Sequence, residues 1–238
     1  MLKIVVPLIA LSLMAGLTVG LKQNMALSDY EKCRDRVHYL LSNRHYKQAS
    51  FWADEAMQKI ELTTPVDNIC DEFFVESLLS IGKYKQAERL TRILPPLVHP
   101  HLKDASDLPE YRQNLRFKAL NGLHLYITAA MEASNSEISS NKDFNVGEAL
   151  LAIGLGERAK QVFKYYPQLA DEYNQLLELV TGDNTRAEQL AQKWISIWSD
   201  SEGERIYELE FCEDMMLRKK CFKAANILAQ EANRIKQL

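Results

Sequence analysis

The sequence has no segment in which apolar and polar residues alternate, the pattern of a half-buried β-strand. It also lacks the short motifs of common enzyme classes: there is no phosphate-binding loop, no His-Glu-x-x-His and no Gly-x-Ser-x-Gly. We therefore expect an all-α protein with essentially no sheet. We also expect no enzymatic activity, with no catalytic residue, no cofactor and no metal site.

A strong charge of either sign is missing as well. The 238 residues include 29 Lys and Arg against 32 Asp and Glu, which gives a formal net charge of −3. Nucleic-acid-binding domains usually carry a marked basic excess, so no nucleic-acid partner is expected. Asn-x-Ser/Thr glycosylation sites are also absent, which favours a bacterial envelope over a eukaryotic secretory route.

The longest apolar run lies at the N-terminus. Lys3 is followed by eighteen uncharged residues, 4–21, and then by Lys22. A short basic start and an apolar core are typical of an export signal, yet eighteen residues are just long enough to cross a bilayer. Residues 1–22 are therefore predicted to be a signal peptide or a membrane anchor. Residues 23–238 would then form a domain that is exported to the periplasm or cell envelope, secreted, or held at the membrane by residues 4–21.

A six-residue pattern ending in alanine recurs along that domain. The clearest copy is Gly-Lys-Tyr-Lys-Gln-Ala at 82–87, and weaker copies begin at positions 44, 154, 182 and 220. The starts are 38, 72, 28 and 38 residues apart, and 72 is two periods of 36 with one degenerate copy. Repeats of this length are typical of stacked helical hairpins. Glycine suits a helix end and alanine permits close helix contact, so each window is predicted to be a turn between two helices.

Apolar periodicity and proline placement suggest where the helices lie. Two hairpins are expected at 28–60 and 66–94, a long helix at about 110–132, and further helices at 147–166, 168–198 and 203–236. Flexible loops are expected near 95–109, which contains four prolines, and near 134–146, which is polar. The side chains expected to face inward in the first helix are Tyr30, Val37, Tyr39, Leu40 and Leu41. Aromatic residues at the third position of three windows are expected to wedge between helices: Tyr46, Tyr84 and Phe222.

The window at 82–87 resembles the tetratricopeptide repeat (TPR) family, whose signature at this turn includes Gly-x-Tyr-x-x-Ala. Gly82, Tyr84 and Ala87 match all three positions, and the other windows match one or two. The resemblance implies a divergent TPR-like α-solenoid of stacked antiparallel hairpins, a fold that serves as a scaffold for protein–protein interaction. The alternative is a set of generic helical hairpins in which alanine and glycine recur by chance.

The same resemblance implies that the first helices of the hairpins line a concave groove, at positions about ten and six residues before each turn. These positions hold Arg34, His38, Glu72, Glu76, Phe144, Glu148, Glu172, Leu176, Glu210 and Asp214. Carboxylates predominate after the first hairpin, which predicts an acidic groove with a basic entrance that suits Lys- or Arg-bearing partner segments. The alternative is that acids favour the first turns of helices for dipole and solubility reasons. In the same way, the cluster Glu208, Glu210, Glu213 and Asp214 is typical of a solvated helix face.

Four cysteines in an exported chain suggest disulfides. Cys33 and Cys70 lie 11 and 12 residues before their turns, so they occupy nearly equivalent sites on adjacent first helices. Neighbouring helices pack about 8–10 Å apart, which makes this pair a possible disulfide. Free buried cysteines are the alternative.

The sequence is compatible with two functions. The first is a non-enzymatic scaffold or adaptor of the cell envelope that binds protein partners through the acidic groove. The second is a helical enzyme-associated or polymer-processing domain that acts on an envelope polymer. An open groove favours the first, and a deep pocket with convergent carboxylates favours the second.

Overall fold

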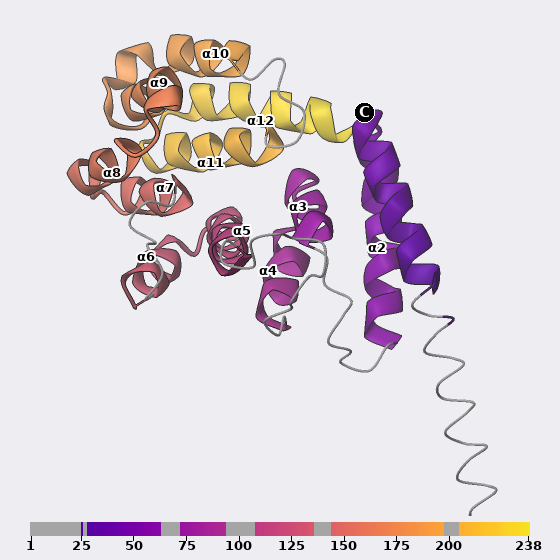
Figure 1. Ribbon diagram of the computed structural model, residues 1–238. Coiled ribbons are helices and arrows are strands. Elements are labelled where there is room, and N and C mark those ends of the chain that lie inside the picture. Colours follow the sequence, from indigo (N-terminus) through magenta and orange to yellow (C-terminus); the bar gives the residue numbers. More distant parts are fainter. Residues whose placement is uncertain (1–24, 26–27, 63–71, 94–107, 136–143, 198–204) are drawn as a thin grey trace, which may run out of the picture.

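The computed structural model describes residues 25, 28–62, 72–93, 108–135, 144–197 and 205–238 (Figure 1). Every regular element within these ranges is a helix, in agreement with the predicted all-α class. The signal or anchor segment at 1–22, Cys70 and most of the two predicted loops lie outside the described residues. None of the described helices is long and apolar enough to cross a membrane.

The helices follow one another with short connections. The first occupies residues 28–42. It is followed by α2 (Tyr46–Leu62), α3 (Glu72–Ser80), α4 (Tyr84–Ile93), α5 (Leu108–Gly122), α6 (Tyr126–Asn135), α7 (Phe144–Ala152), α8 (Gly156–Phe163), η2 (Pro167–Leu169), α9 (Ala170–Thr181), η3 (Asn184–Arg186), α10 (Ala187–Ile197), α11 (Arg205–Arg218) and α12 (Phe222–Lys236). The ends differ slightly from expectation, because α5 already includes Pro109 and α6 reaches Asn135.

Consecutive helices pack against each other as hairpins. Contacts join α3 with α4, α5 with α6, α7 with α8, α9 with α10 and α11 with α12 (Figure 1). Helix α11 also contacts α3, α5 and α9, which are the first helices of three other hairpins. The C-terminal hairpin therefore lies against helices that are distant in the sequence.

Five of the turns between helices share one backbone geometry. Each contains a residue in the left-handed conformation: Arg44 (φ 61°), Gly82 (φ 75°), His124 (φ 59°), Gly154 (φ 84°) and Lys220 (φ 61°). In the clearest copy the Gly82 N–H donates to the Leu79 carbonyl at 3.0 Å and the Lys83 N–H donates to the Leu78 carbonyl at 2.8 Å. This is the Schellman arrangement, which satisfies the last carbonyls of the helix. Glycine at two of the five positions avoids the steric cost of a Cβ there.

A buried alanine follows each of these turns by five residues. The five are Ala49, Ala87, Ala129, Ala159 and Ala225, each at most 2% exposed. The alanine thus marks the point where the second helix meets its neighbours. The predicted windows at 44, 82, 154 and 220 are confirmed as turns between helices.

The turn at His124 is the degenerate copy that the spacing implied, and the predicted single helix at 110–132 is wrong. Helix α5 ends at Gly122 and α6 begins at Tyr126. The left-handed position carries histidine, but Tyr126 and Ala129 match the pattern as Tyr46 and Ala49 do in the window that begins at 44. Gly122 serves a different purpose, because a Cβ there would come within 2.4 Å of the Tyr84 ring.

The window at 182 is also a connection between helices, but of another kind. Gly182 is extended (φ −73°, ψ −178°) and is followed by the short helix η3. The Asp183 side chain accepts a hydrogen bond from the Thr185 N–H at 3.0 Å. Ala187 is still buried, so the packing role of the alanine is kept although the turn differs.

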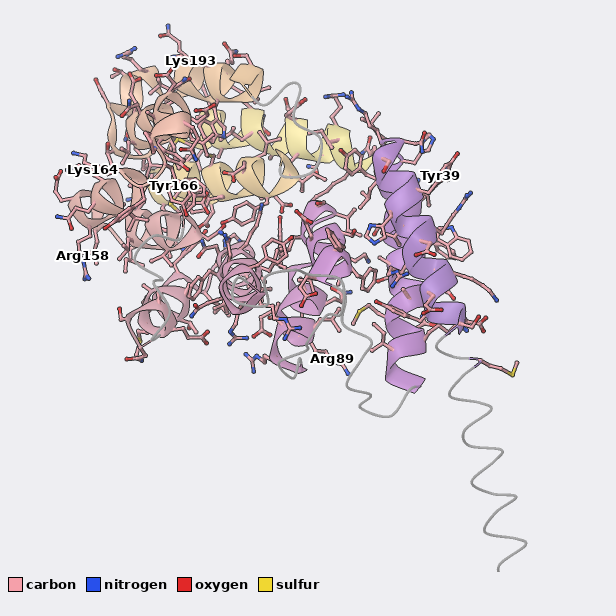
Figure 2. All side chains as sticks on the ribbon, in the orientation of Figure 1. Tyr39, Arg89, Arg158, Lys164, Tyr166 and Lys193 are labelled. Atoms are coloured by element: carbon pink, nitrogen blue, oxygen red, sulfur yellow. The ribbon has the colours of Figure 1, made fainter. Side chains whose placement is uncertain are left out.

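Most predicted inward residues are buried, with two clear exceptions. Tyr30, Val37 and Leu40 are at most 1% exposed, whereas Tyr39 is 57% exposed and lies on the outer side of its helix (Figure 2). Helical spacing explains the difference, since positions 30, 37 and 40 share a face that position 39 does not. Phe222 is 65% exposed and does not wedge between helices as Tyr46 and Tyr84 do.

Candidate binding pocket

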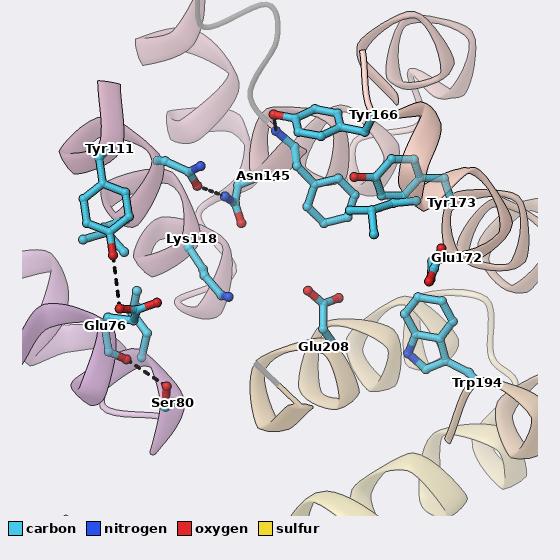
Figure 3. A pocket seen from close by; sticks show the side chains of 15 residues that line it. Glu76, Ser80, Tyr111, Lys118, Asn145, Tyr166, Glu172, Tyr173, Trp194 and Glu208 are labelled. Carbon is cyan, nitrogen blue, oxygen red and sulfur yellow. Dashed lines mark hydrogen bonds between the residues drawn. The ribbon is translucent and has the colours of Figure 1, made fainter. Parts of the chain in front are cut away.

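A cavity of about 220 Å³ lies where the first helices of five hairpins converge (Figure 3). Helices α3, α5, α7, α9 and α11 contribute to its walls, together with α10 and the segment from Tyr166 to Leu169. The lining residues are Glu76, Leu79, Ser80, Tyr111, Asn114, Leu115, Lys118, Phe144, Asn145, Tyr166, Leu169, Glu172, Tyr173, Trp194 and Glu208. Tyr166, Tyr173, Trp194 and Glu172 lie on one side of this pocket, and Tyr111, Glu76 and Lys118 lie on the other, with Glu208 between them (Figure 3).

Stacked rings make the aromatic side rigid. The Tyr173 ring stacks on Phe144 and on Phe163, with centroids 4.7 Å apart in both pairs. The Tyr166 hydroxyl accepts a hydrogen bond from the Phe144 N–H at 3.1 Å. A Cβ at Gly147 would come within 2.4 Å of the Phe163 ring, so glycine is what lets that ring lie flat against α7. The packing of these rings therefore fixes the shape of this wall without a ligand.

Two buried carboxyl groups meet at the floor of the pocket. Glu148 is fully buried and accepts a hydrogen bond from the Tyr207 hydroxyl at 2.5 Å. Burial, followed by the negative charge of Glu208, raises the pKa of Glu148 well above its ordinary value. Glu208 is 2% exposed and reaches the pocket surface. The charge of Glu208 next to this buried group therefore favours the protonated form of Glu148. Glu208 is thus no part of a solvated face, contrary to the expectation for its cluster.

Lys118 supplies a positive charge opposite this pair. Its side chain extends from α5 toward Glu208 (Figure 3), and the residue is only 8% exposed. The ammonium nitrogen lies 4.9 Å from the centre of the Tyr207 ring, within the range of a cation–π contact. Its charge lowers the pKa of Glu148 and so offsets part of the effect of burial.

Three of the predicted groove positions meet in this pocket. Glu76, Phe144 and Glu172 come from α3, α7 and α9, and all three line it. Glu76 accepts a hydrogen bond from the Tyr111 hydroxyl at 3.1 Å. Residues from three different hairpins thus line one cavity.

Four other predicted groove carboxylates have partners within the chain. Glu72 pairs with Arg112, and Glu148 bonds to Tyr207. On α11, Glu210 accepts a hydrogen bond from Tyr84 and pairs with Lys236, and Asp214 accepts from Tyr126 at 2.9 Å and from Arg218 at 2.8 Å. Tyr84 and Tyr126 each lie two residues after the left-handed residue that ends the preceding helix. Equivalent residues of two hairpins therefore bond to successive helical turns of α11.

The remaining predicted positions lie away from the pocket lining or in the core. Arg34 pairs with Asp35 at 2.8 Å, and the His38 ring lies 3.1 Å from the Ser77 hydroxyl. Neither residue lines the pocket, so no basic entrance adjoins it in the described part of the chain. Leu176 is fully buried in the core.

The three described cysteines are free thiols. Cys33 and Cys212 are buried, and Cys221 is partly buried. Because Cys70 lies outside the described residues, the Cys33–Cys70 disulfide stays a prediction. Burial, together with Glu208 and Glu148, raises the pKa of the Cys212 thiol well above its ordinary value, which makes it a poor nucleophile.

The sequence did not identify Lys118, Tyr173, Trp194 or Glu208 as pocket residues. Trp194 is 2% exposed and lines the pocket. A signal was available, because Lys118 interrupts the apolar positions of α5. Charged residues are rarely buried unless they are paired, so an isolated charged residue on an apolar helix face indicates a polar site in the interior.

His124 links the turn of the α5–α6 hairpin to α11 in a pH-dependent way. Its hydrogen bond to Asp214 raises the pKa of the histidine, and the two groups are 3.5 Å apart. Burial raises the pKa of Asp214, but bonds from His124, Arg218 and Tyr126 outweigh it, and the net shift is downward.

We expect a His124→Asn variant to lose stability below about pH 6.5 and to match the wild type at high pH. A raised histidine pKa stabilises the fold fully below the ordinary value of 6.5, and this gain is lost as the pH rises through the raised value. Asparagine tolerates the left-handed conformation. The loss should be about 1 kcal/mol or less, because the side chain is half exposed. Thermal melts at pH 5.5 and 8.5 test this, and a difference that does not change with pH would contradict it.

Among the described residues no group of three or more histidine, cysteine or acidic side chains could hold a metal ion. Comparison with known proteins identifies no relative: no protein-family model matches the chain, and no curated protein and no solved structure matches it significantly.

Proposed function

We propose that this protein is a non-enzymatic scaffold or adaptor that binds protein partners at the pocket formed by its first helices. The observation that carries the proposal is the convergence of Glu76, Phe144 and Glu172, from three hairpins, on one cavity. These residues were expected to face a partner because of their positions in the repeat. No local feature of any one hairpin brings them together.

The repeated turns support a TPR-like α-solenoid as the framework of this scaffold. Five turns share a left-handed residue, and each is followed five residues later by a buried alanine. In such an architecture each hairpin buries its apolar face on its neighbours, which leaves the inner helices to meet a partner. We place the domain outside the cytoplasm, in the cell envelope, with residues 1–22 as its export signal or anchor.

The size of the pocket indicates what kind of partner fits. At about 220 Å³ it is smaller than the roughly 300–1,000 Å³ of pockets that enclose a drug-sized ligand. It therefore suits one side chain of a partner segment that lies across the opening. The carboxylates around it favour a basic segment over an acidic one.

The convergent carboxylates also favour a second candidate, a domain that processes an envelope polymer. Glycosidases use two carboxyl groups that flank the scissile bond between two sugar units. A cavity of about 220 Å³ has little room for two sugar units, and Glu148 is fully buried. For these reasons partner binding is the better-supported function.

Photo-crosslinking tests this proposal. A benzoylphenylalanine at Tyr111, which lines the pocket and is 38% exposed, is expected to capture a protein when the full-length chain is irradiated in its native membrane. Mass spectrometry would identify the captured segment. The matched control is the same probe at Tyr165, which is 55% exposed and does not line the pocket. Equal capture from both positions, or capture of polysaccharide at Tyr111, would contradict the proposed function.

A further inference from the structure

The pocket contains a polar group that the fold leaves unsatisfied. Tyr173 is 4% exposed, and its hydroxyl has no hydrogen-bond partner among the described residues. Tyr173 lines the cavity, and its hydroxyl points away from α9 (Figure 3). Leaving a buried hydroxyl without a partner is unfavourable, so a ligand that satisfies it gains affinity. Burial raises the pKa of Tyr173, and the hydroxyl therefore stays protonated and can donate or accept.

The charges around this hydroxyl are mainly negative. Glu76, Glu172 and Glu208 line the cavity, and Lys118 is the one cationic side chain that lines it within the described residues. Glu148 does not line the cavity, and burial and Glu208 raise its pKa, which favours its neutral form. Lys118 offsets one of the three lining carboxylates, which leaves the cavity net negative.

The aromatic side of the cavity suits an aliphatic stem or a flat cation. Phe144, Tyr166, Tyr173 and Trp194 present ring surface, and the stacking of Tyr173 on Phe144 holds the wall in place. Lysine and arginine bury their methylene stems along apolar surface while the charged group reaches polar partners. Aromatic faces also attract cations directly.

We propose that this cavity is a receptor for one lysine or arginine side chain of a partner protein. The stem lies against Phe144, Tyr173 and Trp194, and the charged group meets Glu172 and Glu208. Tyr173 accepts a hydrogen bond from the charged group. The inference rests on the proposed function, since it specifies the side chain by which a protein partner is held.

Capped amino acids test the inference without knowledge of the partner. The probes are the Nα-acetyl N-methylamides of lysine, arginine, norleucine and glutamate, titrated into the full chain by isothermal calorimetry. We expect the lysine or the arginine probe to bind about tenfold or more tightly than norleucine, because charge-assisted hydrogen bonds contribute beyond the apolar stem. Equal binding of norleucine, or tighter binding of glutamate, would overturn the inference.

Variants of the cavity locate the binding. Glu172 is partly exposed, so Glu172→Gln should fold normally. This variant is expected to weaken binding of the cationic probe about tenfold without changing binding of the norleucine probe. Tyr173→Phe should weaken the cationic probe as well. The control is Glu157→Gln, an exposed carboxylate on α8 outside the cavity, which should change nothing. If Glu157→Gln weakened the probe as much as Glu172→Gln, binding would be diffuse attraction and the inference would fail.

The two tests separate this inference from the proposed function. Capture of a protein at Tyr111 together with no binding of the lysine and arginine probes would refute the cation receptor and leave the scaffold standing. Specific binding of a cationic probe with no protein captured at Tyr111 would support the receptor and count against the scaffold.

Discussion

Replacing Glu148 with glutamine is expected to raise the thermal stability of the protein at pH 8 and to change it little at pH 5. Burial and the neighbouring Glu208 raise the pKa of Glu148 well above 4.5, so the folded chain holds a proton that the unfolded chain releases. Stability therefore falls with rising pH between 4.5 and the raised pKa, by about 1.4 kcal/mol per pH unit for one proton.

Glutamine removes this cost because its amide resembles the protonated carboxyl. Its carbonyl can accept from the Tyr207 hydroxyl, and its amino group can donate to Glu208. Thermal or denaturant melts from pH 5 to pH 8 would show the gap between variant and wild type widening with pH. The control is Glu157→Gln on exposed surface, which should give curves parallel to the wild type. Parallel curves for Glu148→Gln as well would contradict a raised pKa of Glu148 in the folded chain.

Enlarging the alanine that follows a turn is expected to destabilise the fold by about 1–3 kcal/mol, because extra methylene groups overpack a close helix contact. Ala87 and Ala129 are both 0% exposed, and each lies in the second helix of a hairpin. Leucine at either position should lower the melting temperature by roughly 2–4 °C per kcal/mol for a chain of this size.

Lys85→Leu and Thr128→Leu are the matched controls, since both residues are exposed on the same two helices. They should change stability by about 0.5 kcal/mol or less. The Ala129 variant is the more informative, because the turn before it was predicted to be part of a single helix at 110–132. Unchanged melts for Ala87→Leu and Ala129→Leu would argue that these alanines do not mark close helix contacts, and so against the repeat.

The turns were largely predictable because their determinants are local. A left-handed residue closes each helix with two backbone hydrogen bonds, and an alanine five residues later begins the next contact. The copy at 124–129 was missed although Tyr126 and Ala129 match the pattern as Tyr46 and Ala49 do. The exposure of Tyr39 and Phe222 was also misjudged. Three of the predicted groove positions, Glu76, Phe144 and Glu172, line the cavity, and the others do not.

The amino-acid sequence by itself determined the all-α class and the places of most turns, since backbone conformation and helical periodicity depend on neighbouring residues. Only the tertiary structure decided the chemistry of the pocket. Its floor depends on α11 lying against α3, α5 and α9, and on pairs that are distant in sequence: Tyr207 and Glu148 are 59 residues apart, Tyr126 and Asp214 are 88, and Tyr84 and Glu210 are 126. No local pattern distinguishes the buried Glu208 from a glutamate on a solvated face, because burial is decided by which distant helix covers it.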